Sequence, residues 1–230
     1  MAETSPPTVD ESSHGLKRPR PRDAGCLVLH RKSGEHFEVL VGRRGSRARF
    51  KPGVYVFPGG ALESADCLVS PLRSLTGDVA RALNCSQRRA NAIAMAAVRE
   101  TYEETGLMFG EPGDTAPISN PSWLAFQACG LTPDLSFLDF LGRAITPTYH
   151  SIRYHARFFA ANYERFSGEL RGNGELEDLR WVRTDRLAAS DTTIIQTAIV
   201  EVIHFRLHKT VAPAKRLFYK WGRHNFIDIL

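Results

Sequence analysis

Three glutamates, Glu100, Glu103 and Glu104, stand within five positions of one another and are followed by Gly106. At about 100° per residue, a helix places them on one arc. The opposite side then carries the core positions Ala94, Met95, Val98, Thr101, Tyr102 and Thr105. Stability alone disfavours this arrangement, because like charges one turn apart cost about 0.2–0.5 kcal/mol and the negative end of the helix dipole is near.

A bound divalent cation would remove that repulsion, and carboxylate oxygens are the ligands that Mg²⁺ and Mn²⁺ prefer. We therefore predict a Mg²⁺ or Mn²⁺ site with Glu100, Glu103 and Glu104 as ligands, against the ordinary alternative of a solvated acidic face. Arg99 stands beside them and can pair with a carboxylate to fix its orientation. The small or aliphatic residues on the same arc, Ile93, Ala96 and Ala97, are expected to leave room for a loop and a ligand.

A glycine turn and a basic segment precede this helix. In Pro58-Gly59-Gly60 the glycines allow the backbone to approach phosphate oxygens closely, so Gly59 and Gly60 are predicted to bind substrate. Just upstream lie the basic residues Arg43, Arg44, Arg47, Arg49 and Lys51. These side chains could neutralise several phosphates, although a solvated basic hairpin explains any single one of them equally well.

The composition indicates a soluble protein for anionic ligands. The 230 residues carry a net charge of +5, which suits phosphorylated metabolites, nucleic acid or a membrane surface. The four cysteines form no C-x-x-C pair, so we expect neither a disulfide framework nor a cysteine zinc site, and a reducing cytoplasm fits. No apolar run is long enough for a signal peptide or a membrane span. We expect a cytoplasmic protein with no membrane partner.

The pattern of elements favours an α+β or α/β sandwich. We expect a strand hairpin over 25–30 and 36–44, a third strand over 54–57 and a short helix around 72–83. Ser86 is a candidate N-cap for a helix that runs to Thr105. Later strands are expected within 151–163 and 179–184, and an amphipathic helix over 192–209.

Three parts follow from these elements. Residues 1–22 are expected to be a flexible arm rich in basic residues and proline, 23–210 the main domain with an insertion at about 67–90, and 211–230 a basic, aromatic tail packed on the domain.

Several histidines and aromatic residues have an ordinary structural explanation. His204 and His208 stand one helical turn apart but lack the glutamate of H-E-x-x-H, so we favour a helix-surface pair over a zinc site. His150 and His155 are expected on the sheet surface. Tyr149 and Phe158 could line a substrate pocket, but core packing is the favoured interpretation, as it is for the tryptophans Trp123, Trp181 and Trp221.

The glutamate segment together with Gly60 resembles the Nudix box, G-x(5)-E-x(7)-R-E-U-x-E-E-x-G-U, where U is aliphatic. Gly60 matches the opening glycine, and residues 99–107, RETYEETGL, match the second half at every position except Thr101. Asp66 replaces the first box glutamate, and residues 67–98 separate it from Arg99 where the pattern has seven residues. Residues 47–66 and 145–159 are similar to the branch of this family that cleaves coenzyme A and its acyl esters.

The resemblance implies a Nudix-type α/β/α sandwich with a mixed central β-sheet. It also implies a metal-dependent diphosphatase, with Glu100, Glu103 and Arg99 as catalytic residues and with Glu100 or a loop glutamate, Glu175 or Glu177, as the base. The main hypothesis is hydrolysis of coenzyme A or acyl-coenzyme A to a phosphopantetheine derivative and adenosine 3′,5′-bisphosphate.

Two alternatives and one question about assembly stay open. The same chemistry could act on ADP-ribose, a dinucleotide or a sugar nucleotide, because the box reports the reaction and not the leaving group. A non-catalytic module that binds nucleic acid is the alternative of another class, although the intact carboxylates argue against it. We therefore expect a small-molecule nucleotide-diphosphate partner and leave a homodimer open.

Overall fold

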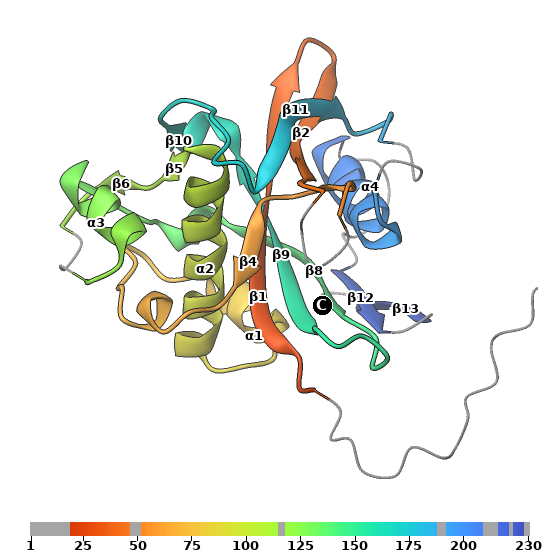
Figure 1. Cartoon of the computed structure of the whole chain (residues 1–230), viewed down its shortest axis with the longest axis horizontal. Coiled ribbons are helices and arrows are strands. Elements are labelled where there is room, and N and C mark those ends of the chain that lie inside the picture. The colour runs from red at the N-terminus through yellow and green to blue at the C-terminus, as the bar shows by residue number, and fades with distance from the viewer. Residues whose placement is uncertain are drawn as a thin grey trace, which may run out of the picture.

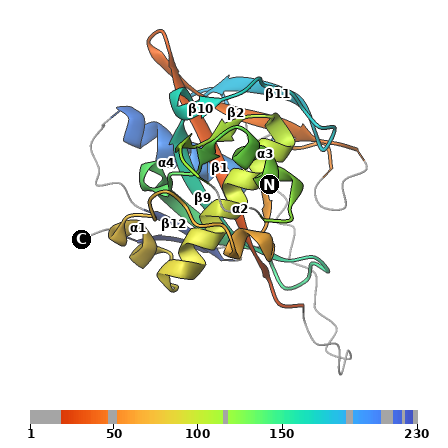
Figure 2. The same cartoon turned by 90° about the vertical axis from the view of Figure 1, so that its left-hand side faces the viewer.

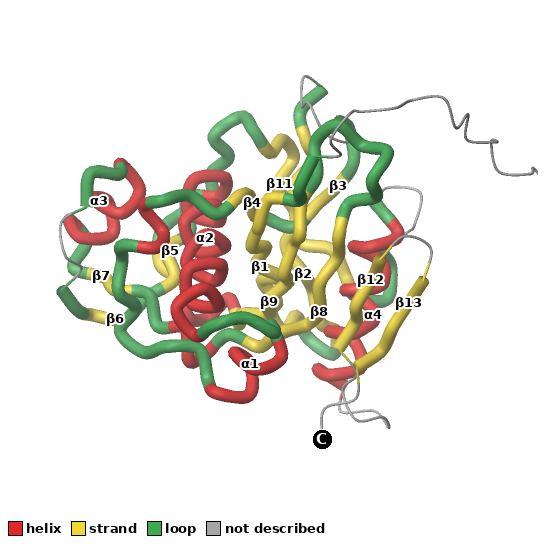
Figure 3. The backbone as a smooth tube through the Cα atoms, turned by 90° about the horizontal axis from the view of Figure 1, so that it is seen from below, coloured by secondary structure: helices red, strands yellow, loops and turns green. Residues whose placement is uncertain are grey.

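A mixed β-sheet stands between two helical layers, as Figure 1 shows and Figure 3 shows from below. The computed structural model describes residues 19–46, 52–114, 118–187, 192–208, 216–220 and 223–227. In these residues the sheet has nine strands, and its main path runs β11-β2-β1-β9-β8-β12-β13. The expected α/β/α sandwich with a mixed central sheet is confirmed.

The strands of this sheet are β1 (Arg22–Ser33), β2 (His36–Arg44), β3 (Tyr55–Val56), β4 (Gly59–Ala61), β8 (Asp139–Ile145), β9 (Tyr154–Asn162), β11 (Leu176–Arg183), β12 (Arg216–Lys220) and β13 (Arg223–Ile227). β1 runs parallel to β9 and β8 parallel to β12, whereas the other pairs are antiparallel. β3 pairs with β2, and β4 pairs with the first half of β1. Two small sheets join β5 (Met108–Phe109) to β10 (Phe166–Ser167) and β6 (Glu111–Pro112) to β7 (Leu131–Thr132).

The helices divide between the two faces of the sheet. The long helix α2 (Gln87–Thr105) packs on one face together with α1 (Gly77–Ala82) and α3 (Pro121–Ala128), which Figure 2 shows in front of the sheet. α4 (Ile194–His208) covers the other face. Short 3₁₀ turns are η1 (Ala65–Cys67), η2 (Leu135–Phe137) and η3 (Tyr163–Arg165). In the parts of the chain described here, no helix is long and apolar enough to cross a membrane.

Alternation along β1 builds a core on each side of the sheet, because successive strand side chains point to opposite faces. Leu27 and Leu29 pack in the cluster under α2 with Met95, whereas Val28 packs in the cluster under α4 with Ile203. The strands near the middle of the sheet are therefore buried on both faces.

Most expected elements are present. β1 and β2 form the expected hairpin. The Ser86 side chain accepts a hydrogen bond from the Arg89 N–H, which caps α2 as predicted, and Gly106 ends the helix with a φ of 75°. The expected helix at 72–83 shortens to α1, because Leu72 donates to the Pro133 carbonyl and Arg73 forms a bridge with Asp134, which hold the first residues outside the helix.

Two expectations were wrong. Gly59 and Gly60 lie in strand β4, opposite Cys26 and Gly25 of β1, and not in a loop. Ile93, Ala96 and Ala97 leave no open space, since all three are fully buried. The reason is that α2 is covered on most of its circumference, by the sheet on one side and by η1, α1 and α3 on others.

Candidate active site

The closest approach of α2 to the sheet is made possible by glycines on the neighbouring strands. A Cβ atom at Gly25 would stand 2.2 Å from the Ile93 carbonyl oxygen, and one at Gly60 would stand 2.4 Å from the Glu100 carboxyl carbon. Since no other residue type fits such contacts, these positions let the middle of α2 lie against β1 and β4. Glu100 and Glu104 thereby lie close to β4, at a cavity that Gly59 and Gly60 also line.

Glu100 and Glu104 together line a cavity of about 670 Å³. Glu104 is 3% exposed, and its Oε2 atom accepts a hydrogen bond from the Gly59 N–H at 2.8 Å. Gly59 and Gly60 line the same cavity. The Gly59 N–H is thus already bonded to Glu104, so Gly59 orients a carboxylate where the sequence had suggested a direct contact with phosphate.

For both carboxyl groups, burial outweighs the effect of the one favourable partner, Gly59 for Glu104 and Arg99 for Glu100. Burial raises the pKa of Glu104 to about 8, and the charge of Glu100 adds to this while the Gly59 hydrogen bond opposes it. Burial also raises the pKa of Glu100 to about 7, against the opposing charge of Arg99. Buried carboxylates with raised pKa values that lie side by side in a cavity are typical of functional sites.

Glu103, one position before Glu104, lies in a different environment. Its carboxylate accepts hydrogen bonds from Arg99 at 2.9 Å and from the Ser122 hydroxyl, and it does not line the cavity. The helix geometry explains this, since position 103 is rotated by about 60° from 100 and about 100° from 104, toward Arg99. The structure therefore brings Glu100 and Glu104 to the cavity, whereas Glu103 meets Glu100 at the Arg99 Nη1 atom.

Arg99 is fully buried at the centre of the network that holds Glu103. Its Nε and Nη2 atoms donate to Asp66 at 2.8 and 3.1 Å, and Nη2 also donates to the Ala61 carbonyl. Its Nη1 atom lies 3.0 Å from Glu100. Burial alone would lower the pKa of Arg99, but the hydrogen bonds to Asp66 and the charge of Glu100 raise it instead.

The network also includes Asp66 and Trp123, whose roles the sequence did not suggest. Asp66 is 1% exposed, accepts from the Glu63 N–H at 2.9 Å, and contacts the Trp123 indole N–H at 3.3 Å. Asp66 thus lies against Arg99 despite the long insertion between them. No sequence signal links Trp123 to this site, because the contact joins residues 57 positions apart.

The predicted basic residues separate into two groups. Arg44 lines the cavity, and its buried Nε atom has no hydrogen-bond partner among the described residues. Arg43 points elsewhere and pairs with Glu177 at 3.4 Å. Arg47 and Arg49, like Lys51, lie outside the described residues.

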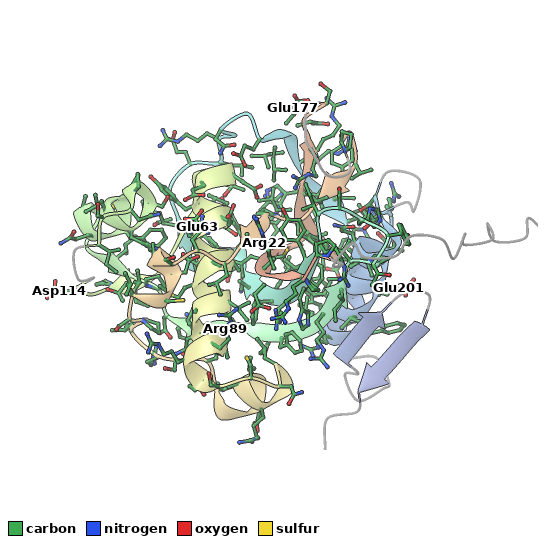
Figure 4. All side chains as sticks on the ribbon, turned by 60° about the horizontal axis from the view of Figure 1, so that its bottom comes forward. Arg22, Glu63, Arg89, Asp114, Glu177 and Glu201 are labelled. Atoms are coloured by element: carbon green, nitrogen blue, oxygen red, sulfur yellow. The ribbon has the colours of Figure 1, made fainter. Side chains whose placement is uncertain are left out.

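The two loop glutamates also separate. Glu175 lines the cavity. Glu177 lies at the outer surface of the molecule, where Figure 4 labels it, and its side chain is 48% exposed. Of these two, only Glu175 is placed where it could act on a ligand beside Glu100 and Glu104.

The wall of the cavity that the sequence did not predict comes from distant segments. It combines β9, the loop that joins β8 to β9, and the start of α4, with the side chains Ala144, Tyr154, Ala156, Phe158, Thr192, Ile195 and Gln196. Tyr149 lines it too and is 70% exposed, so the favoured core packing was wrong for Tyr149. Phe158 is buried and also faces the cavity.

The remaining predicted side chains have structural surroundings. His204 bonds to the Thr184 hydroxyl at 2.8 Å, and its ring lies 4.3 Å from that of His208. Burial, together with the charges of Arg157 and Arg143, lowers the pKa of His155 to about 4. Trp181 packs at the edge of the core under the Arg31 guanidinium, and Trp221 lies outside the described residues.

The carboxylates at the cavity fit a hard divalent cation whose other ligands come from water and the substrate. In the described parts of the chain, no three His, Cys, Asp or Glu side chains gather into a group that could hold a metal ion by themselves. Mg²⁺, however, is usually held by one or two carboxylates together with water and substrate phosphates. Glu100 and Glu104 supply that number of carboxylates at a cavity with room for a ligand.

The protein is an α/β/α sandwich with helical glutamates at a cavity. Comparison with known proteins gives its family. Residues 19–201 match the family model described as NUDIX domain, so the chain belongs to the Nudix family. It is 28% identical over 144 residues to a putative nudix hydrolase 7 of Caenorhabditis elegans. That match covers 63% of this chain and 41% of the relative, so the aligned part spans about two fifths of the relative's length.

A solved structure supports the same fold. The NUDIX hydrolase from Alicyclobacillus acidocaldarius superposes with a TM-score of 0.62 and is 26% identical. The match covers 80% of this chain and 91% of that one. The sandwich is therefore shared over nearly the whole of that protein.

Proposed function

We propose that the protein hydrolyses a diphosphate bond in a nucleotide-type substrate with the help of a divalent cation, Mg²⁺ or Mn²⁺. The observation that carries the proposal is the pairing of Glu100 and Glu104 at one cavity that Arg44 also lines. Two carboxylates for a cation and a guanidinium for phosphate oxygens are what a diphosphate needs. Membership of the Nudix family supports the same reaction class.

In this mechanism, Glu100 and Glu104 would hold the cation, because both line the cavity that would take the diphosphate. When bound, the cation supplies Lewis-acid stabilisation of the charge that develops on the phosphate oxygens. The Gly59 N–H keeps the Glu104 carboxylate aimed at the cavity. Asp66 fixes Arg99 through an ion pair. Arg99 in turn positions Glu100, because the Arg99 Nη1 atom lies 3.0 Å from the Glu100 carboxylate.

Arg44 and the glutamates at the cavity have two further roles, which are phosphate binding and removal of a proton from water. The Arg44 guanidinium lines the cavity, so it can neutralise a phosphate oxygen there through a charged hydrogen bond. Glu175 or Glu100 takes the proton of the attacking water, since both line the cavity. Glu103 serves the site indirectly, by binding Arg99 and Ser122.

We further propose coenzyme A or an acyl-coenzyme A as the substrate, with a phosphopantetheine derivative and adenosine 3′,5′-bisphosphate as products. A cavity of about 670 Å³ accommodates part of a large substrate. Its apolar wall, which includes Val56, Phe158 and Ile195, suits the pantetheine or acyl part better than a sugar. The resemblance of residues 47–66 and 145–159 to the coenzyme A branch adds to this support.

A substrate panel tests both levels of the proposal. Coenzyme A, acetyl-coenzyme A, ADP-ribose, a diadenosine polyphosphate and a sugar nucleotide are incubated with Mg²⁺ and with Mn²⁺, and the products are separated by chromatography. We expect the highest kcat/KM for coenzyme A or its ester, with adenosine 3′,5′-bisphosphate released. Brisk cleavage of ADP-ribose without cleavage of coenzyme A would overturn the substrate, and no cleavage of any member would overturn the reaction.

A further inference from the structure

Two aromatic rings lie side by side at the rim of the cavity. Tyr149 and His150 belong to the loop that joins β8 to β9, and both line the cavity. Their ring centroids are 4.5 Å apart, with an interplanar angle of 38°. Tyr149 is 70% exposed, which makes it the most exposed large hydrophobic side chain in the described part of the chain.

The loop that presents these rings is held in place by its own hydrogen bonds. Thr146 and Tyr154 close its base, with the Thr146 N–H donating to the Tyr154 carbonyl at 2.9 Å and the Tyr154 N–H donating to the Thr146 hydroxyl at 3.0 Å. Arg153 donates to the Thr146 carbonyl at 3.0 Å. Such bonds fix the backbone, so the aromatic pair has a defined position before any ligand binds.

An exposed aromatic ring beside a cavity is suited to stacking on a flat ligand group. Stacking of a nucleobase on an aromatic side chain stabilises binding by about 1–3 kcal/mol. A nucleobase also has polar edges that stay hydrated, so it fits the half-exposed rim better than the buried wall. An alkyl chain fits the buried part of the wall instead, where Val56 and Phe158 lie.

We propose that Tyr149, with His150 beside it, binds the nucleobase of the substrate by stacking at the rim of the cavity. This inference rests on the proposed function, because it assigns the nucleoside part of the same substrate. The base then lies at the rim while Glu100, Glu104 and Arg44 take the diphosphate inside the cavity. Tyr149 is thus a specificity residue that distinguishes nucleotide substrates from other diphosphates.

Binding of two non-hydrolysable probes tests the inference. α,β-Methylene-ADP and methylenediphosphonate share the bridged diphosphate and differ in the nucleoside. Their dissociation constants are measured calorimetrically in Mg²⁺ for the full chain, wild type, Tyr149→Phe, Tyr149→Leu and Tyr149→Ala. We expect Tyr149→Ala and Tyr149→Leu to weaken α,β-methylene-ADP by about tenfold, since a single stacking contact is lost. Tyr149→Phe should bind as the wild type does, and methylenediphosphonate should bind equally to all four proteins.

Each other outcome overturns the inference. Wild-type affinity in Tyr149→Leu would mean that the side chain is only an apolar cover. Equal weakening of both probes in Tyr149→Ala would mean that the loop or the fold had changed, and no binding of α,β-methylene-ADP to the wild type would remove the subsite. Failure of the proposed function is a separate result, namely absence of hydrolysis in the substrate panel while the stacking effect on α,β-methylene-ADP persists.

Discussion

The two sides of the acidic end of α2 differ in how their charges are compensated. On the cavity side, Glu104 is buried and Glu100 is partly buried, and their pKa values are raised to about 8 and about 7. On the other side, Glu103 is bound by Arg99 and Ser122, and Arg99 is bound by Asp66. Glu103, which is three positions from Glu100 and one from Glu104, therefore has a different task from both. On the cavity side, the carboxyl groups of Glu100 and Glu104 are available to a ligand. On the other side, the Glu103 carboxylate holds the helix in place through Arg99 and Ser122.

The largest effect that separates the two sides should come from Arg99→Met. The Asp66 side chain is fully buried, so removal of its partner leaves an unpaired charge. Breaking a buried ion pair from one side costs about 3–5 kcal/mol. Urea denaturation should show a fall of that size in the free energy of unfolding, and the double variant with Asp66→Asn should recover part of it. A loss below about 1 kcal/mol would mean that the network does not hold the helix.

The next largest effect should be on turnover, in Glu104→Gln. The amide oxygen can still accept the Gly59 N–H, so the fold should persist, but a cation ligand is lost. Because bound metal supplies several kcal/mol of charge stabilisation, kcat should fall by about a hundredfold or more. Initial rates on the best substrate of the panel measure this, with thermal unfolding as the control for folding.

Glu103→Gln is the matched control for that experiment, since it changes a carboxylate of the same helix that does not line the cavity. We expect a fall in kcat of less than about tenfold, because only the support of Arg99 is weakened. Equal losses in the two variants would abolish the difference between the two sides.

A smaller effect is expected for Gly60→Ala. The added Cβ atom would meet the Glu100 carboxyl group at 2.4 Å, so that side chain or β4 must shift. We expect a loss of about 1–3 kcal/mol in stability from overpacking, with reduced turnover. Gly77→Ala controls for loss of a glycine, because its φ is not positive and an added Cβ atom there would meet the flexible end of Arg81 at 3.3 Å. Unchanged kcat in Gly60→Ala would show that the close approach is dispensable.

The smallest effect should come from Ser122→Ala, which removes one hydrogen bond to Glu103. Glu103 keeps its bond to Arg99, so we expect a loss of about 0.5–1.5 kcal/mol in stability and little change in kcat. Chemical denaturation and initial rates measure the two quantities. A hundredfold loss of turnover would instead place Glu103 in the chemistry.

Local patterns made the helix, its cap and the β1–β2 hairpin predictable, because Ser86, Gly106 and the alternating strands act over a few residues. The same spacing put Glu100 and Glu104 on one arc. Sequence could not separate Glu103 from them, since its partner Ser122 comes from α3, or place Asp66 against Trp123. The cavity wall formed by the β8–β9 loop and the start of α4 could not be predicted either, because these segments and α2 come together only in the tertiary fold.

The most direct measurement is the position of a cation in a crystal of the full protein grown with Mn²⁺ and α,β-methylene-ADP. Anomalous diffraction identifies the manganese. We predict an anomalous peak at the carboxylate oxygens of Glu100 and Glu104, at the distance expected for an oxygen ligand of about 2.0–2.6 Å. A peak held by Glu103, or a nucleotide bound in the cavity with no cation at Glu100 and Glu104, would contradict the account.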